Sequence, residues 1–154
     1  MLKANFITAQ EAAEKIQDGS TLCTIGMTLV SASESILKAI EKRFEMVGHP
    51  ADITLVHSCG QSDRKDGIQH LAHEGLVKRI VGSHWGLQPR WMEMIANSQV
   101  EAYCLPQGQI AQLYRSMACG LPGKMSKVGL GTFIDPRVEG GKMNDRTKPL
   151  PDIV

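Results

Sequence analysis

The residues of this chain that are best suited to bind a ligand lie where predicted strands end. They are glycines, whose backbone can bend sharply or pass close to a bulky group, together with one amide and one hydroxyl side chain. The candidate set is Gly26, Gly60, Gln107, Gly108, Gly129, Gly131 and Thr132. Ligands of open α/β sheets bind at the carboxyl ends of the strands, so these residues predict one ligand site at that edge.

Gln107 is the strongest polar candidate in this set. It follows Pro106 at the point where a strand is expected to end and a helix to begin. Its amide can donate to a carboxylate or a carbonyl, and the free backbone amides of a helix start can bind an anion. The alternative interpretation is that Gln107 only shapes the turn into the helix.

Other reactive side chains lack the neighbours that catalysis or metal binding requires. Nothing close to Cys59 in the sequence would activate its thiol as a nucleophile. His70, His73 and Glu74 form the order H-x-x-H-E, which matches neither H-E-x-x-H nor H-x-x-E-H, and no third ligand is identifiable. We therefore expect no metal site in this chain.

The glutamates have structural interpretations. Glu11 and Glu34 fall at the ends of two capping boxes that begin at Thr8 and Ser31, where the acid satisfies a free amide. Glu74 is expected to form an ion pair or a hydrogen bond. No glutamate stands out as a nucleophile.

The elements that must position these residues alternate between helix and strand. The expected strands are residues 21–25, 53–56, 79–81, 100–105 and 125–130. The expected helices lie between Thr8 and Gly19, between Ser31 and Gly48, at 68–76, after Pro89 and at 109–119, with Met92, Ile95, Ile110, Leu113 and Met117 facing the core. Right-handed crossovers between strands then predict a three-layer αβα fold with a mainly parallel open sheet of about five strands. The loops expected at its carboxyl edge are 26–28, 58–60, 83–86, 106–108 and 129–132.

Composition excludes several classes of protein. The chain has 154 residues, 42% of them hydrophobic and 21% charged, with a net charge of +1, which is ordinary for one globular domain. This balance argues against nucleic acid or an anionic membrane as the main partner. No apolar run approaches the length of a membrane span, and no signal pattern opens the sequence. The cysteines are scattered, which favours reduced thiols and a cytoplasmic protein; they are Cys23, Cys59, Cys104 and Cys119.

Three strings of the sequence resemble the large single-chain type of family I coenzyme A transferases, the propionate/acetate and 3-oxoacid CoA-transferases. They are residues 71–78 leading to 84–86, residues 103–108, and residues 127–137 followed by 139–144. The resemblance extends from about Phe6 to Asn144. It implies the CoA-transferase-like architecture, and it assigns residues 1–144 to the N-terminal, alpha-type domain.

The resemblance also implies a reaction. CoA would move between a short-chain acyl-CoA and a carboxylate through a glutamyl-CoA thioester, with the CoA thioester as substrate and no separate cofactor. The family's nucleophilic glutamate belongs to the C-terminal half, so this chain would hold no catalytic residue and would be inactive alone. Gln107 would line the acyl or carboxylate site. The family has a glycine-rich turn after the first strand, with a Gly-Gly-Phe-like pattern, and Gly26 is the one residue here that matches it. Because Ile25-Gly26-Met27 departs from this pattern, the acyl specificity stays open.

Two other interpretations remain at this point. Residues 145–154 are expected to be a linker or the start of a missing second half, supplied by the same protein or by a beta-type subunit, in a homo-oligomer. A non-catalytic ligand-binding or sensing domain of the same fold would need no such partner. An inert fragment is the third interpretation.

Overall fold

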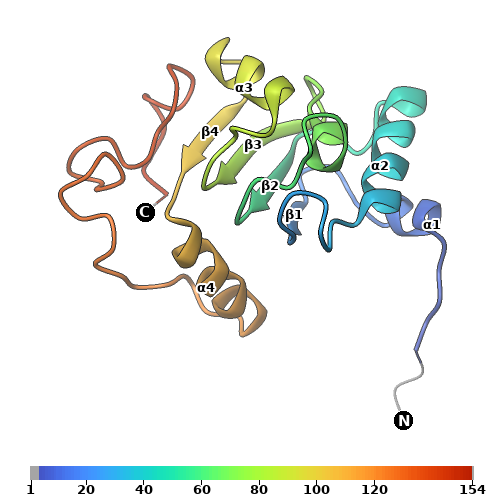
Figure 1. Ribbon diagram of the computed structural model, residues 1–154, viewed down its shortest axis with the longest axis horizontal. Helices are drawn as coiled ribbons and strands as arrows, with labels where there is room; N and C mark the ends of the chain where they lie inside the picture. The colour runs from blue at the N-terminus through green and yellow to red at the C-terminus, as the bar shows by residue number, and fades with distance from the viewer. Residues whose placement is uncertain (1–3, 154) are drawn as a thin grey trace.

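Four parallel strands form the sheet at the centre of the computed structural model, which describes residues 4–153 (Figure 1). The strands lie side by side in chain order and are β1 (Thr21–Thr24), β2 (Ile53–His57), β3 (Val77–Gly82) and β4 (Glu101–Cys104). All three pairings are parallel. The carboxyl ends of the four strands therefore meet at one edge of the sheet.

Helices cover both faces of this sheet (Figure 1). They are α1 (Ala9–Glu14), α2 (Glu34–Val47), the 3-10 helix η1 (Gly67–Leu71), α3 (Pro89–Ala96) and α4 (Gln107–Ala118). The first four pack into the larger core with one face of the sheet, and α4 packs through Ile110 into a smaller core on the other face. The three-layer αβα prediction is confirmed.

Strand β2 shows why both faces must be covered. Ile53 and Leu55 point into the larger core, whereas Val56 points into the smaller one. All three side chains are buried. A parallel strand that is apolar on both faces is typical of a sheet enclosed between helix layers.

The first of the two predicted capping boxes is confirmed and the second is wrong. The Thr8 amide donates to Glu11 Oε2 (2.7 Å), and the Glu11 amide donates to Thr8 Oγ1 (3.2 Å). Helix α2 begins two residues later than predicted, so its N-cap is Ser33 and not Ser31. The Ser33 side chain makes no capping bond. The Glu34 carboxylate instead accepts from the distant Gly67 amide (2.9 Å), so a tertiary contact replaces the local one.

The predicted last strand, residues 125–130, is also wrong. Residues 125–127 of this segment are irregular and residues 128–130 form a turn, with 96% of Met125 accessible to solvent. The free edge of β4, where a fifth strand could pair, is taken by the C-terminal segment (Figure 1). There, the Cys104 amide donates to Gly141 O (2.8 Å) and the Met143 amide to Ala102 O (3.0 Å).

Smaller corrections concern side chains and helix length. Met92 and Met117, expected in the core, are 52% and 40% exposed, whereas Ile95 and Ile110 are buried as predicted. The helix expected at 68–76 is a single 3-10 segment, η1. Cys23 is exposed because β1 lies at the open edge of the sheet.

The boundary expected near residue 144 stays a prediction. Asn144 Nδ2 donates to Ile95 O (3.0 Å) and Val100 O (2.9 Å), which ties the last residue of the expected domain to α3 and to the start of β4. Residues 1–3 and 154, which the predicted segments 1–144 and 145–154 include, lie outside the described residues. None of the helices in the range 4–153 combines the length and hydropathy needed to cross a lipid bilayer.

Candidate functional site

Two of the predicted ligand loops contact each other at the carboxyl edge of the sheet. The Thr28 amide, after β1, donates to Gly60 O (2.8 Å), after β2. The Cys59 thiol donates to Gly26 O (3.2 Å). The structure thus brings Gly26 and Gly60 of the candidate set together.

The packing of these loops requires glycine at position 26 and leaves little room for a side chain at position 60. Gly26 has φ +139°, and a Cβ there would lie 2.9 Å from Val30 O. A Cβ on Gly60 would lie 2.7 Å from His84 Cε1 in the loop after β3. Loop packing alone therefore accounts for glycine at position 26, whereas at position 60 the exposed His84 side chain could move aside.

His57 is a buried polar residue at this edge that the sequence analysis missed. Its Nδ1 donates to Cys59 O (2.8 Å), and its ring lies edge-on to Trp85. Within the described residues its Nε2 has no hydrogen-bond partner, nor has the Trp85 indole N–H. Burial lowers the pKa of His57 to about 4, so the ring is neutral at pH 7. The signal in the sequence was a histidine that ends a largely apolar strand.

Gln107 and Gly108 form the first turn of α4, where β4 leads into the helix through Pro106. Both are exposed. In the described part of the chain, the Gln107 side chain makes no hydrogen bond, and a Cβ on Gly108 would meet nothing within 4 Å. This turn therefore presents an uncommitted side-chain amide and the amide end of a helix dipole to a ligand.

The loop 129–132 does not follow a strand, which corrects its expected place at the carboxyl edge. Gly129 and Gly131 have φ +96° and +78°, and Thr132 Oγ1 donates to Gly129 O (2.6 Å). The Gly131 amide donates to the buried Asp135 carboxylate (2.8 Å), whose pKa is lowered by its ion pair with Arg137. Hydrogen bonds within the segment thus fix the conformation of this loop.

Gly129 nevertheless lines a pocket beside α4. The pocket has a volume of about 560 Å³ and lies between α4 and residues 122–136. Pro106 and Gln109 lie on its α4 side, and Leu130 and Ile134 lie opposite. Gly129 therefore shares a cavity with the residue that precedes Gln107, while Gly131 and Thr132 do not line it.

The other reactive residues are placed as follows. Burial raises the pKa of the Cys59 thiol, which disfavours it as a nucleophile. Glu74 is exposed and forms no ion pair within residues 4–153, contrary to expectation. His70 and His73 both contact Glu41 of α2. Their sequence neighbours gave no indication of these long-range contacts.

The loops that follow the four strands, 25–30, 58–61, 83–86 and 105–108, contain no glutamate. Glu101, on β4, pairs with Arg79 (2.7 Å). Glu11 caps α1. The edge thus offers hydrogen-bond donors and glycine backbone without a carboxylate nucleophile of its own.

A parallel α/β sheet with tightly packed loops and a helix start at its carboxyl edge defines the class of ligand-binding α/β domains. The Coenzyme A transferase family matches residues 6–153 of this chain. The chain belongs to the coenzyme A transferase family.

Relatives of the chain are considerably longer. Caffeate CoA-transferase of Acetobacterium woodii is 42% identical over 145 residues, 94% of this chain and 28% of that enzyme. The solved acyl-CoA transferase (YdiF) of Escherichia coli O157:H7, a thioester complex with CoA, is 36% identical, with a TM-score of 0.87 over 96% of this chain and 29% of that one. The alpha subunit of the acetate CoA-transferase of Escherichia coli K12 is 23% identical over 134 residues, 87% of this chain and 58% of that protein. The chain therefore spans between about a quarter and three fifths of these proteins.

Proposed function

We propose that this chain forms the N-terminal, alpha-type part of a CoA-transferase that moves CoA between a short-chain acyl-CoA and a carboxylate. A glutamate carboxylate, from a segment outside this chain, attacks the acyl carbonyl and displaces the CoA thiolate, which leaves an acyl-glutamyl anhydride. The thiolate then attacks the glutamyl carbonyl of the anhydride, releases the acid and forms the glutamyl-CoA thioester. A second acid reverses these steps and leaves with CoA.

The first turn of α4 is the observation that carries this proposal. Each tetrahedral step places negative charge on a carbonyl oxygen, and fixed N–H donors lower the barrier to such a step. The Gln107 amide is exposed and unpaired in the described range, beside the amide end of a 12-residue helix. We assign Gln107 to the acyl or carboxylate wall, with Gly108 allowing the ligand to approach the backbone.

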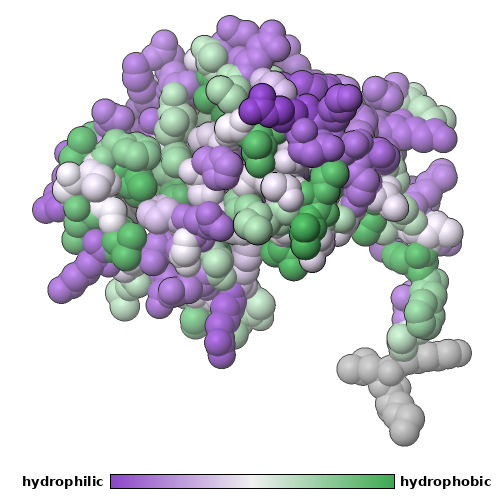
Figure 2. Space-filling view, in the orientation of Figure 1, coloured by the Kyte–Doolittle hydropathy of each residue, from purple (hydrophilic) through white to green (hydrophobic). Residues whose placement is uncertain are grey.

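The remaining candidates complete the wall of the site in this proposal. Gly26 and Gly60 hold the loops after β1 and β2, and Gly129 lines the pocket next to Pro106. Gly131 and Thr132 shape the same loop as Gly129. Figure 2 shows hydrophobic side chains gathered over the β1–α2 loop, where Met27 and Val30 are exposed. These apolar residues suit an acyl chain or the surface of the second half.

The partner of the chain in this proposal is a C-terminal half in the same protein or a beta-type subunit, within a homo-oligomer. Both kinds of relative support it, since the family includes longer single enzymes and a separate alpha subunit. All four cysteines are free thiols, which supports a reducing, cytoplasmic location.

Substitution of Gln107 tests the proposal in an enzyme reconstituted with a C-terminal half. We expect Gln107→Ala to lower turnover about tenfold or more, because a hydrogen bond to a charged group contributes roughly 1.5–3 kcal/mol. Gln112→Ala, which removes an exposed glutamine from the same helix, is the matched control and should leave turnover unchanged. Equal turnover in both variants, with the fold intact by circular dichroism, would reduce Gln107 to a turn residue.

A further inference from the structure

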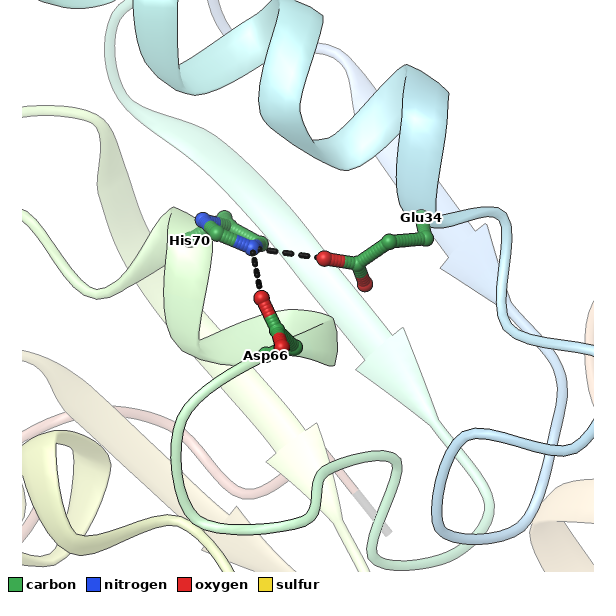
Figure 3. Close-up of side chains that lie close together, drawn as sticks. All are labelled: Glu34, Asp66 and His70. Carbon is green, nitrogen blue, oxygen red and sulfur yellow. Dashed lines mark hydrogen bonds and ion pairs between the residues drawn. The ribbon is translucent and has the colours of Figure 1, made fainter.

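Three side chains from two segments converge between α2 and η1 (Figure 3). His70 Nε2 lies 2.8 Å from Glu34 Oε1 and 3.3 Å from Asp66 Oδ1. The ligand atoms of all three residues lie within 4.8 Å of one another. Glu34 begins α2, whereas Asp66 and His70 lie before and within η1, so the cluster joins two elements.

The contact of His70 Nδ1 determines how the ring is oriented and leaves Nε2 facing Glu34 and Asp66. Its Nδ1 is in hydrogen-bond contact with Glu41 Oε2, and a carboxylate can only accept. Nδ1 therefore carries a proton, and Nε2 faces the carboxylate oxygens of Glu34 and Asp66. The two carboxylates carry like charges, so a cation at the point where they meet Nε2 stabilises the cluster.

The arrangement matches a metal site in geometry and in its supporting contacts. Ligand atoms around a tetrahedral ion with bonds of about 2.0 Å lie roughly 3.3 Å apart. The His70–Asp66 distance of 3.3 Å matches this spacing, and the His70–Glu34 distance of 2.8 Å would lengthen when an ion enters. A metal-binding histidine typically donates its other N–H to a carboxylate, as His70 does to Glu41. The Gly67 amide, which donates to Glu34 Oε2 (2.9 Å), holds the Glu34 carboxylate in place.

We propose that His70, Glu34 and Asp66 bind a first-row divalent transition-metal ion such as Zn²⁺, with Glu41 orienting the histidine ring. The mixture of one imidazole and two carboxylates suits such an ion, and water completes its coordination. The ion links α2 to η1 and stabilises the folded chain.

Lys38 competes with the ion for the two carboxylates. Its Nζ lies 3.0 Å from Glu34 Oε1 and 3.2 Å from Asp66 Oδ1, and its side chain is half-exposed. The ammonium can move into solvent when the ion enters, at a cost in affinity. Removal of Lys38 should therefore tighten binding.

A second group nearby, Glu41, Glu45 and His73, is a weaker candidate. Arg90 already lies 3.4 Å from Glu41 Oε1 and 3.3 Å from His73 Nε2. A fixed guanidinium at this position repels a second cation. The ion is therefore assigned to the His70 group.

Zinc binding to the 154-residue chain tests the proposal. We would measure it by isothermal titration calorimetry in a Cys23→Ser, Cys119→Ser background, which removes the two exposed thiols. We expect one Zn²⁺ per chain, with affinity reduced at least tenfold in His70→Gln and in Asp66→Asn, the latter at a partly exposed position that the fold tolerates. Lys38→Met should tighten binding. Zinc should raise the melting temperature of the parent and leave that of His70→Gln unchanged.

His49→Gln is the matched control, because His49 also contacts a carboxylate, Asp18 (2.9 Å), without a third ligand. Its zinc affinity should equal that of the parent. Absence of saturable binding by the folded parent would overturn the proposal and leave Lys38 or a proton as the charge in the cluster. Equal affinities of the parent and the His70→Gln and Asp66→Asn variants, with the fold intact by circular dichroism, would place any bound zinc elsewhere and overturn it as well.

Discussion

At the scale of single residues, long-range partners decide what the side chains of this protein do. Gln107 could be predicted as a candidate because its position at a strand–helix junction is visible in the local sequence. His70 could not, because Glu41 and Glu34 lie 29 and 36 positions away from it. His57 was missed because its burial depends on the sheet and on Trp85, which local sequence does not encode.

His57 should make stability depend on pH. Its folded pKa of about 4 lies below the ordinary value of 6.5, so between these values the unfolded chain binds a proton that the folded chain excludes. The contribution of His57 is therefore fully present above pH 6.5, is lost as the pH falls toward 4, and changes no further below. The shift corresponds to about 3 kcal/mol.

Urea unfolding between pH 7.5 and 4 would measure this effect. In His57→Asn, whose amide can still donate to Cys59 O, the loss of stability over this range should be smaller than in the parent. The slope with pH, not the absolute stability, is the quantity to compare, because the smaller side chain also leaves a cavity. Parallel pH profiles for the two proteins would contradict a buried neutral His57.

At the scale of the elements, the sequence pattern predicted the four strands of the sheet but not the C-terminal segment. Residues 125–130 were expected to form a fifth strand, but the edge of β4, next to which that strand would lie, is paired with residues 141–143. Strand propensity cannot show which of two segments pairs with an edge strand, because tertiary packing decides this. For the same reason, the loop 129–132 does not follow a strand, although the sequence analysis placed it there.

Glycines of the candidate set should separate into structural and functional positions. Gly26→Ala should destabilise the chain by about 1–3 kcal/mol, because φ +139° and the contact with Val30 O both exclude a side chain. Gly108→Ala should not destabilise it, because α4 has space there and alanine is the better helix former. Urea unfolding checks both, with Gly123→Ala as a control at an open position.

The same variants also test the site. If the ligand approaches the backbone at the start of α4, Gly108→Ala should lower turnover of the reconstituted enzyme at unchanged stability. Full activity of the stable Gly108→Ala variant would remove Gly108 from the site.

At the scale of the whole molecule, the chain exposes apolar surface near its candidate site. Phe6, Ile25, Met27 and Val30 are each more than half exposed, and the last three lie together at the end of β1. A short chain that normally packs against a larger remainder would leave such a surface uncovered.

We therefore expect the isolated chain to self-associate or to bind a hydrophobic dye. Light scattering over a wide concentration range and dye fluorescence would measure this, and Met27→Ser, Val30→Ser should reduce both signals. A clean monomer without dye binding would indicate that this surface needs no partner.

The central claim is that this chain holds one wall of a CoA-transferase site and not its nucleophile. Intact-protein mass spectrometry after incubation with acetyl-CoA, with borohydride trapping of any thioester, tests it most directly. The chain alone should gain no mass of CoA, and addition of a separately expressed C-terminal half should produce a glutamyl-CoA adduct on that half. A CoA adduct mapped to Glu74 or any other glutamate of this chain would contradict the claim, as would a reconstituted pair that binds acetyl-CoA but forms no adduct.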